Sequence, residues 1–170
     1  MNYNDYYMNI ALAVRERANC KGRRVGAVIV RDNRIVSTGY NGTVEGMPNC
    51  LDGGCHRCAN PEEYPAGSGY DVCVCVHAEQ NAILTAARLG IALEGASMYT
   101  TLKPCFNCSK AMRQVKIESI FFLHDWVPNQ ALLKSQYDSL LGSFPGEVTN
   151  IDIPDPRADW AMNKVTKLNA

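Results

Sequence analysis

His77, Cys105 and Cys108 are the residues of this sequence best suited to hold a metal ion. One imidazole and two thiolates give zinc three ligands and leave the fourth tetrahedral position for water, as a catalytic zinc site requires. Glu79 follows His77 by two residues, so it can reach the zinc-bound water but is poorly placed to ligate the metal itself. We therefore expect zinc to activate a water molecule and Glu79 to take and return its proton.

The surrounding sequence favours this catalytic interpretation. The segments that follow His77 and Pro104 are both expected to begin helices, and the positive end of a helix favours a thiolate over a thiol. Two simpler interpretations stay open. A C-x-x-C pair alone often belongs to a structural zinc, a redox site or the core, and Cys73 or Cys75 could close the zinc site as a fourth ligand.

Six further cysteines lie outside this set, in a chain of 170 residues that is long enough to bury a core without disulfides. In a reducing compartment, clustered cysteines are more often metal ligands than bridges, although small buried core residues would account for about two or three of them. Cys55-His56-Arg57-Cys58 has the spacing of a zinc knuckle, which predicts a second, structural zinc. We expect four of the following six residues to bind it: Cys20, Cys50, Cys55, Cys58, Cys73 and Cys75.

The composition excludes several classes of protein. The 17 Lys and Arg balance the 17 Asp and Glu, so the chain is not a globally basic nucleic-acid coat. A content of 46% apolar and 20% charged residues is typical of a globular domain. No run approaches the roughly 18 apolar residues of a membrane span, and the first residues lack the order of a signal peptide. We expect one domain over residues 1–170, with no membrane contact, in the cytoplasm.

The pattern of apolar residues and chain breakers predicts an α/β fold. In a first helix, at about residues 5–19, the residues expected to face the core are Tyr6, Ile10, Ala13, Val14 and the stem of Arg17. Residues 41–75 are rich in Gly, Pro, Asn and Cys, which predicts a long loop held by a metal. The element order predicts a three-layer α-β-α sandwich with a mixed sheet of about five strands. The other expected elements are strands at 25–30, 34–40, 97–102, 118–123 and 147–153, helices at 77–88, 106–116 and 130–141, and a weakly structured tail after about residue 154.

Four segments resemble the zinc-dependent deoxycytidylate (dCMP) deaminases of the cytidine deaminase superfamily, and the resemblance spans most of residues 5–125. The H-x-E…P-C-x-x-C pattern, formed by residues 77–79 and 104–108, is the known signature of zinc nucleobase deaminases. The segments are Val25-Gly26-Ala27-Val28, Gly39-Tyr40-Asn41-Gly42, His77-Ala78-Glu79-Gln80-Asn81-Ala82-Ile83 and the stretch from Gly95 to Cys105.

The resemblance implies a cytidine deaminase-like fold and the hydrolysis of dCMP to dUMP and ammonia, which supplies thymidylate synthesis. It implies that the activated water attacks C4 of the cytosine ring while Glu79 protonates N3 and later the leaving amine. It also implies a homohexamer that dCTP activates and dTTP inhibits. In some members of the family, cysteines that match Cys20 and Cys50 belong to a second zinc site.

A nucleotide phosphate needs cationic or amide partners, and residues 15–34 carry seven Lys or Arg against two acids, a local net charge of +5. The resemblance implies that Asn41 contacts the deoxyribose, and it links the region of Arg88 to nucleotide regulation. A simple turn asparagine and a solvated helix end are the alternatives. The residues expected to contact substrate or effector nucleotides are Lys21, Arg23, Arg24, Gly26, Asn41, Gly42 and Arg88.

Other functions stay open at this point. The zinc chemistry alone would also suit another cytosine nucleotide, such as dCTP, or a base in nucleic acid. A nucleic-acid substrate needs an extended cationic track with exposed aromatic residues, which zero net charge and 8% aromatic residues disfavour. In a more remote alternative, the protein is a non-catalytic zinc-binding module in which Glu79 has no chemical role.

Overall fold

A mixed sheet of five strands forms the centre of the protein in a computed structural model, which describes residues 1–65 and 67–162. The strand order is β2-β1-β5-β6-β7; β1 pairs antiparallel with β2 and β5, whereas β5, β6 and β7 are parallel to one another. The predicted mixed sheet is confirmed. The strand bounds are Gly26–Arg31 for β1, Arg34–Tyr40 for β2, Ser97–Leu102 for β5, Ser119–His124 for β6 and Val148–Asn150 for β7.

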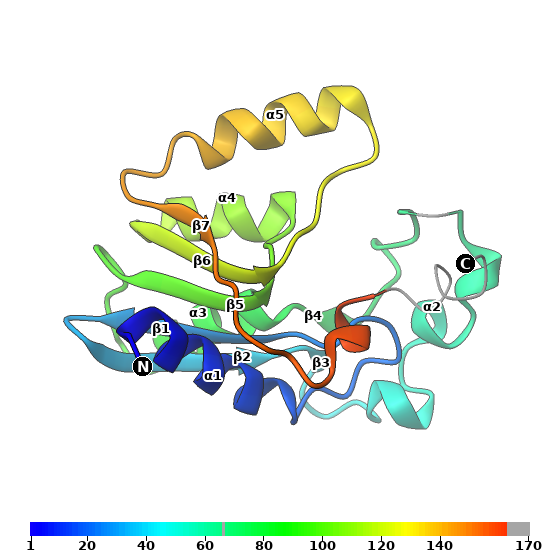
Figure 1. Cartoon of the computed structure of the whole chain (residues 1–170). Helices are drawn as coiled ribbons and strands as arrows, with labels where there is room; N and C mark the ends of the chain where they lie inside the picture. The colour runs from blue at the N-terminus through cyan, green and yellow to red at the C-terminus, as the bar shows by residue number, and fades with distance from the viewer. Residues whose placement is uncertain (66, 163–170) are drawn as a thin grey trace.

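Helices cover both faces of this sheet, which gives the predicted three layers (Figure 1). Alternate side chains of β1 point to opposite faces, as strand geometry requires. Ala27 and Ile29 pack in the cluster that contains helix α3, whereas Val28 and Val30 pack in the cluster that contains α1. The helix bounds are Tyr3–Arg15 for α1, Ala78–Arg88 for α3, Phe106–Gln114 for α4 and Ala131–Leu141 for α5.

The core-facing side of α1 differs in part from the prediction. The buried residues are Tyr7, Met8, Ala11 and Arg15, while Tyr6 is 47% exposed. Both stripes have helical spacing, and the predicted one is confirmed in part: Ile10 and Val14 are partly buried against the core, whereas Tyr6, Ala13 and the Arg17 stem are exposed. Arg15, which the prediction left out, is on the buried side. Its guanidinium is in fact buried, since it has an acidic partner far along the chain.

Two glycines let the helices that flank the sheet come close to the strands. A Cβ on Gly26 would lie 2.2 Å from the carbonyl oxygen of Ala11 in α1, and a Cβ on Gly39 would lie 2.2 Å from the carbonyl oxygen of Ala78 in α3. Both distances are far below van der Waals contact. Gly39 therefore sets how close the first turn of α3, which carries Glu79, lies to β2.

Between β2 and α3 the described residues form only short elements (Figure 1, beside the label α2). β3 and β4 pair antiparallel, with Thr43 opposite Cys75. This pairing joins the two ends of the cysteine-rich segment directly before His77. The elements are β3 Gly42–Thr43, 3-10 helices at Cys50–Asp52 and Pro61–Glu63, α2 His56–Ala59, and β4 Cys75–Val76.

The segment after residue 154, which the sequence predicts to be weakly structured, contacts the N-terminal part of the chain. A short 3-10 helix, Ala158–Ala161, places the Trp160 ring 4.5 Å from the guanidinium carbons of both Arg24 and Arg157. Residues 163–170 lie outside the described part of the structure. Within residues 1–65 and 67–162, no helix is both long and apolar enough to cross a membrane.

Candidate metal centre and active site

The three predicted zinc ligands lie at the beginnings of two helices. His77 is the N-cap residue of α3 and Cys105 is the N-cap residue of α4, so Cys108 falls in the first turn of α4. The Gln80 side chain accepts a hydrogen bond of 3.2 Å from the backbone N–H of His77, which fixes the start of α3. Both helix N-termini therefore direct their positive ends at this group of donors, which favours thiolates and metal-bound oxygen ligands.

The distances among the donor atoms fit a tetrahedral zinc. His77 Nδ1 lies 3.5 Å from Cys105 Sγ and 3.4 Å from Cys108 Sγ. With Zn–N near 2.0–2.1 Å and Zn–S near 2.3 Å, a tetrahedron predicts an N···S separation of about 3.6 Å. The described residues offer three donors here, all within 4.8 Å of one another, so a fourth position is left for water.

Cys105 and His77 are charged at neutral pH, whereas hydrogen bonding to Cys105 and burial raise the pKa of Cys108. The Cys108 thiol, like His77, must therefore release a proton when a metal binds. Hydrogen bonding to Cys108 and the neighbouring His77 outweigh burial and lower the pKa of Cys105 to about 4. The Cys105 thiolate in turn raises the pKa of His77 to about 9, although burial opposes this. Thiolate and imidazole are the forms that accept a metal once the protons of His77 and Cys108 are displaced.

Glu79 is a buried carboxyl group beside this centre. Its residue is 4% exposed, and burial raises its pKa to about 7, although His77 opposes the shift. Cys105 and Cys108 also act on this pKa, so the carboxyl group lies close to all three donors. A carboxyl group with a pKa near neutrality both accepts and donates protons at neutral pH, as general acid–base catalysis requires.

Two polar residues that the sequence did not reveal support the second ligand segment. The hydroxyl of Tyr137, a buried residue of α5, donates a 2.5 Å hydrogen bond to the carbonyl oxygen of Pro104. The Ser109 hydroxyl donates a 3.0 Å hydrogen bond to the carbonyl oxygen of Cys105. Neither residue belongs to a spacing motif, so only the fold shows that both hold the turn that carries Cys105.

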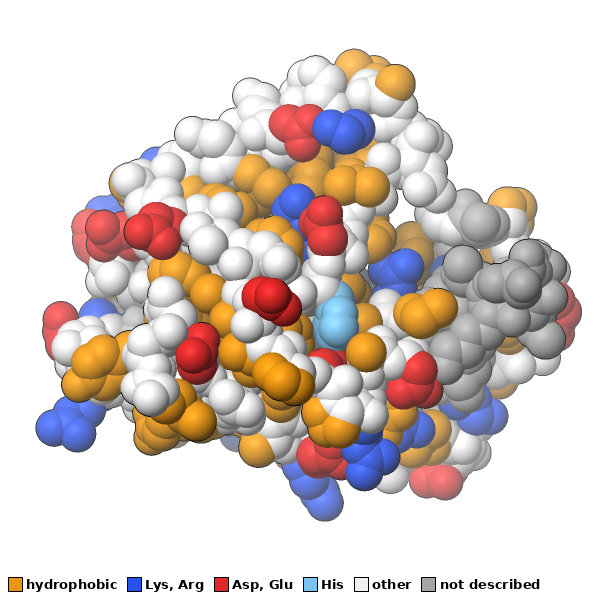
Figure 2. Space-filling view, viewed as in Figure 1, with side chains coloured by type: hydrophobic (Ala, Val, Ile, Leu, Met, Phe, Trp, Pro, Cys, Tyr) orange, Lys and Arg blue, Asp and Glu red, His pale blue; other side chains and the backbone are white. Residues whose placement is uncertain are grey.

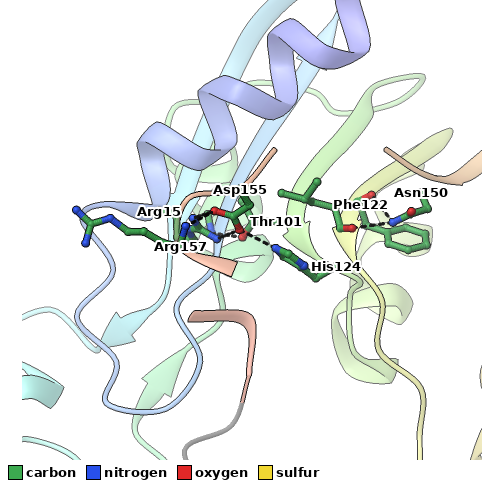
Figure 3. Close-up of polar contacts among 9 residues, drawn as sticks. Arg15, Thr101, Phe122, His124, Asn150, Asp155 and Arg157 are labelled. Atoms are coloured by element: carbon green, nitrogen blue, oxygen red, sulfur yellow. Dashed lines mark hydrogen bonds and ion pairs between the residues drawn. The ribbon is translucent and has the colours of Figure 1, made fainter. Parts of the chain in front are cut away.

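A buried ion pair stabilises the other end of the turn that carries Cys105 (Figure 3). Asp155 accepts hydrogen bonds of 2.7 and 2.6 Å from both terminal nitrogens of Arg15, and its Oδ2 lies 2.6 Å from Nε2 of His124. His124 ends β6, and its carbonyl oxygen accepts a 2.8 Å hydrogen bond from the backbone N–H of Lys103. Lys103 precedes the ligand Cys105 by two residues. The ion pair is therefore connected, through His124 and Lys103, to the turn that carries Cys105.

Asn41, predicted to contact the deoxyribose, has its side chain in contact with the backbone of the preceding loop. Its Oδ1 accepts a 2.8 Å hydrogen bond from the N–H of Val25, and its Nδ2 donates a 2.8 Å hydrogen bond to the carbonyl oxygen of Arg23. One lone pair and one N–H are left for a sugar hydroxyl. Gly42 packs against the Asn19 side chain, and Gly26 is buried under α1.

The basic stretch at residues 15–34 is not the free cationic patch that its charge count suggests. Arg15 is committed to Asp155, Arg24 stacks on Trp160, and Arg31 donates a hydrogen bond to the carbonyl oxygen of Ala92. Arg15 and Arg23 both have a buried Nε with no hydrogen-bond partner among the described residues, but the terminal nitrogens of Arg15 bind Asp155, whereas the Arg23 side chain has no acidic partner within that part of the chain. Of these arginines, Arg23 is therefore the best candidate to meet a phosphate.

The two remaining basic candidates lie in different surroundings. Lys21 is half-buried, and its backbone N–H donates a 3.3 Å hydrogen bond to Cys50 Sγ. Arg88 lies in the last turn of α3, where its side chain is 78% exposed and lies 3.9 Å from a carboxylate oxygen of Glu45. Arg88 is thus available to a ligand from solvent.

The six other cysteines converge on one place in the fold, although they come from residues 20–75. The sulfur atoms of Cys20 and Cys58 lie 3.8 Å apart, and those of Cys55 and Cys73 lie 3.7 Å apart. All eight cysteines of the chain are free thiols. These distances are far too long for the roughly 2.05 Å of a disulfide bond.

The face of the protein in Figure 2 mixes charges of both signs. Acidic and basic side chains alternate with apolar ones over the described residues visible in this view, and the basic ones do not join into a continuous track. A polymer of phosphates requires such a track. The described residues visible on this face therefore do not form the basic track that a nucleic acid needs.

An α/β sandwich that brings three metal donors and a buried carboxyl group together at two helix starts has the groups that metal-assisted hydrolysis requires. The model of the cytidine and deoxycytidylate deaminase zinc-binding region matches residues 1–124. The chain belongs to this family, which confirms the resemblance seen in the sequence.

Individual relatives agree with this assignment. The deoxycytidylate deaminase of Schizosaccharomyces pombe is 40% identical over 121 residues, which are 71% of this chain but only 37% of that protein. The deoxycytidylate deaminase of Enterobacteria phage T2 is 33% identical, over 90% of this chain and 92% of that one. The dCMP deaminase of cyanophage S-TIM5, solved in complex with dCMP and dUMP, superposes with a TM-score of 0.65 at 25% identity, over 86% of this chain and 95% of that one.

Proposed function

We propose that this protein catalyses the zinc-dependent hydrolytic deamination of dCMP to dUMP and ammonia. The observation that carries the proposal is the Glu79 carboxyl group, buried beside three donors whose spacing fits a tetrahedral zinc. Zinc bound by His77, Cys105 and Cys108 supplies an activated water at neutral pH. The deaminase names of the relatives supply the substrate class.

In this proposal the chain's own residues position and protonate the substrate. Glu79 takes a proton from the water and delivers protons to N3 of cytosine and to the leaving amine, because its pKa lies near neutrality. One water is consumed and one ammonia is released, so the reaction needs no further reactant. Burial of Glu79 keeps bulk water away from these proton transfers.

In the same proposal, the phosphate of dCMP binds to Arg23, in the loop that precedes β1. Arg23 offers a buried Nε with no partner among the described residues, and Asn41 ties the backbone of residues 23–25 to the start of β3. A guanidinium is well suited to a phosphate, since it donates several hydrogen bonds in one plane. Lys21 lies two residues away and adds positive charge to this loop.

An ammonia-release assay tests the activity and its substrate. The substrates compared are deoxycytidine, dCMP, dCTP and a cytosine-containing oligonucleotide. We expect dCMP to give the highest kcat/KM and Arg23→Gln to reduce kcat/KM for dCMP more than for deoxycytidine. Preference for the oligonucleotide, or no ammonia from any of the four substrates with zinc-loaded protein, would contradict the proposal.

We further propose that the enzyme works as a cytoplasmic homohexamer activated by dCTP and inhibited by dTTP. The exposed residues Leu84 and Leu89, on either side of Arg88 at the end of α3, support an oligomer because subunits commonly bury such apolar surface. Arg88 offers an exposed cation for an effector phosphate. Analytical ultracentrifugation gives the subunit number. The charge reversal Arg88→Glu should abolish the response to both nucleotides and leave basal turnover intact.

We also propose that the six-cysteine cluster binds a structural zinc. Short elements alone would not order residues 44–74, and a metal cross-link supplies the missing constraint. The sulfur distances of 3.7–3.9 Å support this, because thiolates on one zinc lie about 3.8 Å apart. The zinc content of purified protein measures this site directly.

A further inference from the structure

The six cysteines outside the candidate active site divide into two overlapping sets of four. In one set the sulfur atoms of Cys20, Cys50, Cys58 and Cys75 all lie within 4.8 Å of one another. In the other set the same holds for Cys55, Cys58, Cys73 and Cys75. Cys58 and Cys75 belong to both sets, so each set also has two sulfurs of its own.

This division is the geometry of two tetrahedra that share one edge. Each tetrahedron has two terminal corners, Cys20 and Cys50 in one and Cys55 and Cys73 in the other. The shared edge joins Cys58 and Cys75. Six thiolates arranged in this way satisfy two zinc ions with four sulfurs each, which is the Zn₂Cys₆ stoichiometry known from small DNA-binding modules.

Three sulfur–sulfur distances in the structure, one in the first set and two in the second, match the edges of such tetrahedra. Cys20 and Cys58, in the first set, lie 3.8 Å apart. In the second set, Cys73 lies 3.7 Å from Cys55 and 3.9 Å from Cys58. An edge of about 3.8 Å is expected for a Zn–S distance near 2.3 Å, so these three edges have the length that zinc requires. The remaining edges are all within 4.8 Å.

The burial of these sulfurs argues against an ordinary apolar core. Cys50 and Cys55 are fully buried and Cys20 is 6% exposed, yet Val74 is the sole aliphatic residue packed into this cluster among the described residues. Six thiols bury little apolar area, and a single zinc would use only four of them. A second zinc accounts for the two sulfurs that remain.

We propose that this segment binds a binuclear zinc cluster in which the thiolates of Cys58 and Cys75 bridge the two ions. The inference rests on the structural zinc proposed above and adds a second ion to it. Loading two Zn²⁺ on six cysteine thiols releases six protons and leaves a cluster of net charge −2. The N–H of Lys21, which donates to Cys50 Sγ at 3.3 Å, stabilises part of this charge.

The bridging position connects the cluster to the candidate active site. Cys75 lies in β4, two residues before the zinc ligand His77, and β4 pairs with β3 directly after Asn41. Cys20 lies one residue before Lys21 and three before Arg23. The two ions would therefore fix the distance between the zinc ligand His77 and the proposed phosphate contacts Lys21 and Arg23.

Metal counting on the intact, zinc-replete protein tests the proposal. Together with the catalytic site, we expect three zinc ions per chain by elemental analysis and by native mass spectrometry. Two ions per chain would overturn the binuclear cluster but leave a single structural zinc in place. One ion per chain would overturn both this cluster and the structural zinc, with the catalytic proposal unaffected.

Two further experiments test the cluster. One uses a variant that removes a single non-bridging ligand, and the other is a spectroscopic measurement. Cys73→Ser should lower the count from three ions to two, because it breaks only the second set, while Val72→Ala, an exposed neighbour, should keep three. If Cys73→Ser does not fold, ¹¹³Cd NMR of the unmodified protein decides. Three sulfur-ligated cadmium signals are expected, one of them from the candidate catalytic site; scalar coupling between the other two supports bridging thiolates, and the absence of coupling between any two signals overturns the proposal.

Discussion

Arg15 and Asp155 are separated by 140 positions in the sequence, yet their side chains form two hydrogen bonds of 2.7 and 2.6 Å. The side chains are only 1% and 3% exposed, so this is a buried, bidentate ion pair. It joins the end of α1 to the segment after β7 and to His124 at the end of β6 (Figure 3). The pair therefore bears on the stability of the fold and on how that stability depends on pH.

Asp155→Asn should destabilise the protein by about 3–5 kcal/mol, because it leaves the buried Arg15 charge without its counterion. Urea unfolding followed by circular dichroism measures the loss. Asp152→Asn, at an exposed position three residues earlier, should change the free energy of unfolding by less than about 0.5 kcal/mol. The double variant Arg15→Met, Asp155→Leu should recover much of the stability, and equal losses in all three variants would contradict this account.

The same pair makes stability depend on pH in the acid range. Burial by itself raises the pKa of Asp155, but the hydrogen bonds from Arg15 and His124 outweigh it and hold this pKa well below its usual range. The unfolded chain then binds the proton more tightly than the folded protein, so the free energy of unfolding rises with pH. The contribution is complete above the usual carboxyl pKa of about 4 and is lost as the pH falls towards the lower folded value.

Unfolding experiments on the parent protein and Asp155→Asn from about pH 6 to about pH 3 measure this dependence. The difference in stability between the two should shrink as the solution becomes more acidic. Both proteins lose zinc in acid, and the comparison removes that shared effect. A difference that stays constant over the whole range would contradict the assigned pKa.

Glu79→Gln should lower kcat for dCMP by a factor on the order of 10² to 10⁴, since glutamine is nearly isosteric but carries no proton to transfer. Zinc content and thermal stability should be retained, because Glu79 is not a ligand. Glu62→Gln, at an exposed position, is the matched control and should keep the parent rate. Turnover near the parent rate in Glu79→Gln would remove the proton-shuttle role.

Gly39→Ala should reduce both stability and activity. The added methyl group would lie 2.2 Å from the Ala78 carbonyl oxygen and 2.4 Å from the Ala82 nitrogen, so α3 must move away from β2. We expect a loss of about 1–3 kcal/mol and a lower kcat, because Glu79 moves with the helix. Gly142→Ala has the same chemistry at a right-handed position with its nearest neighbour 3.4 Å away, and it should be neutral or slightly stabilising.

The sheet and the candidate metal centre could be predicted because both depend on short-range patterns. β-branched runs on either side of Asp32 and Asn33, which both adopt positive φ, define the β1–β2 hairpin locally. His77 and Cys105 are recognisable since each precedes a helix and carries a partner two or three residues later. This spacing alone predicts which side chains lie together at the start of a helix, without knowledge of any tertiary contact.

Pairings between distant single residues could not be predicted in this way. Arg15 looked like one of seven cations in a basic stretch, because nothing near it in sequence reveals Asp155. The same ambiguity misplaced part of the buried side of α1, where two adjacent stripes have equal periodicity and the buried charge decides between them. The sharing of Cys58 and Cys75 by two sets of sulfurs likewise depends on how β4 returns to β3.

The contact between α1 and the segment after β7 also sets an order of events during synthesis. A ribosome completes α1 and the hairpin early, but the counterion of Arg15 is translated 140 residues later. Until then the nascent chain must either keep the Arg15 side chain in water or bury it unpaired. Because a buried charge without its counterion is costly, full docking of the first helix on the sheet is favoured only once the residues that follow β7 have been made.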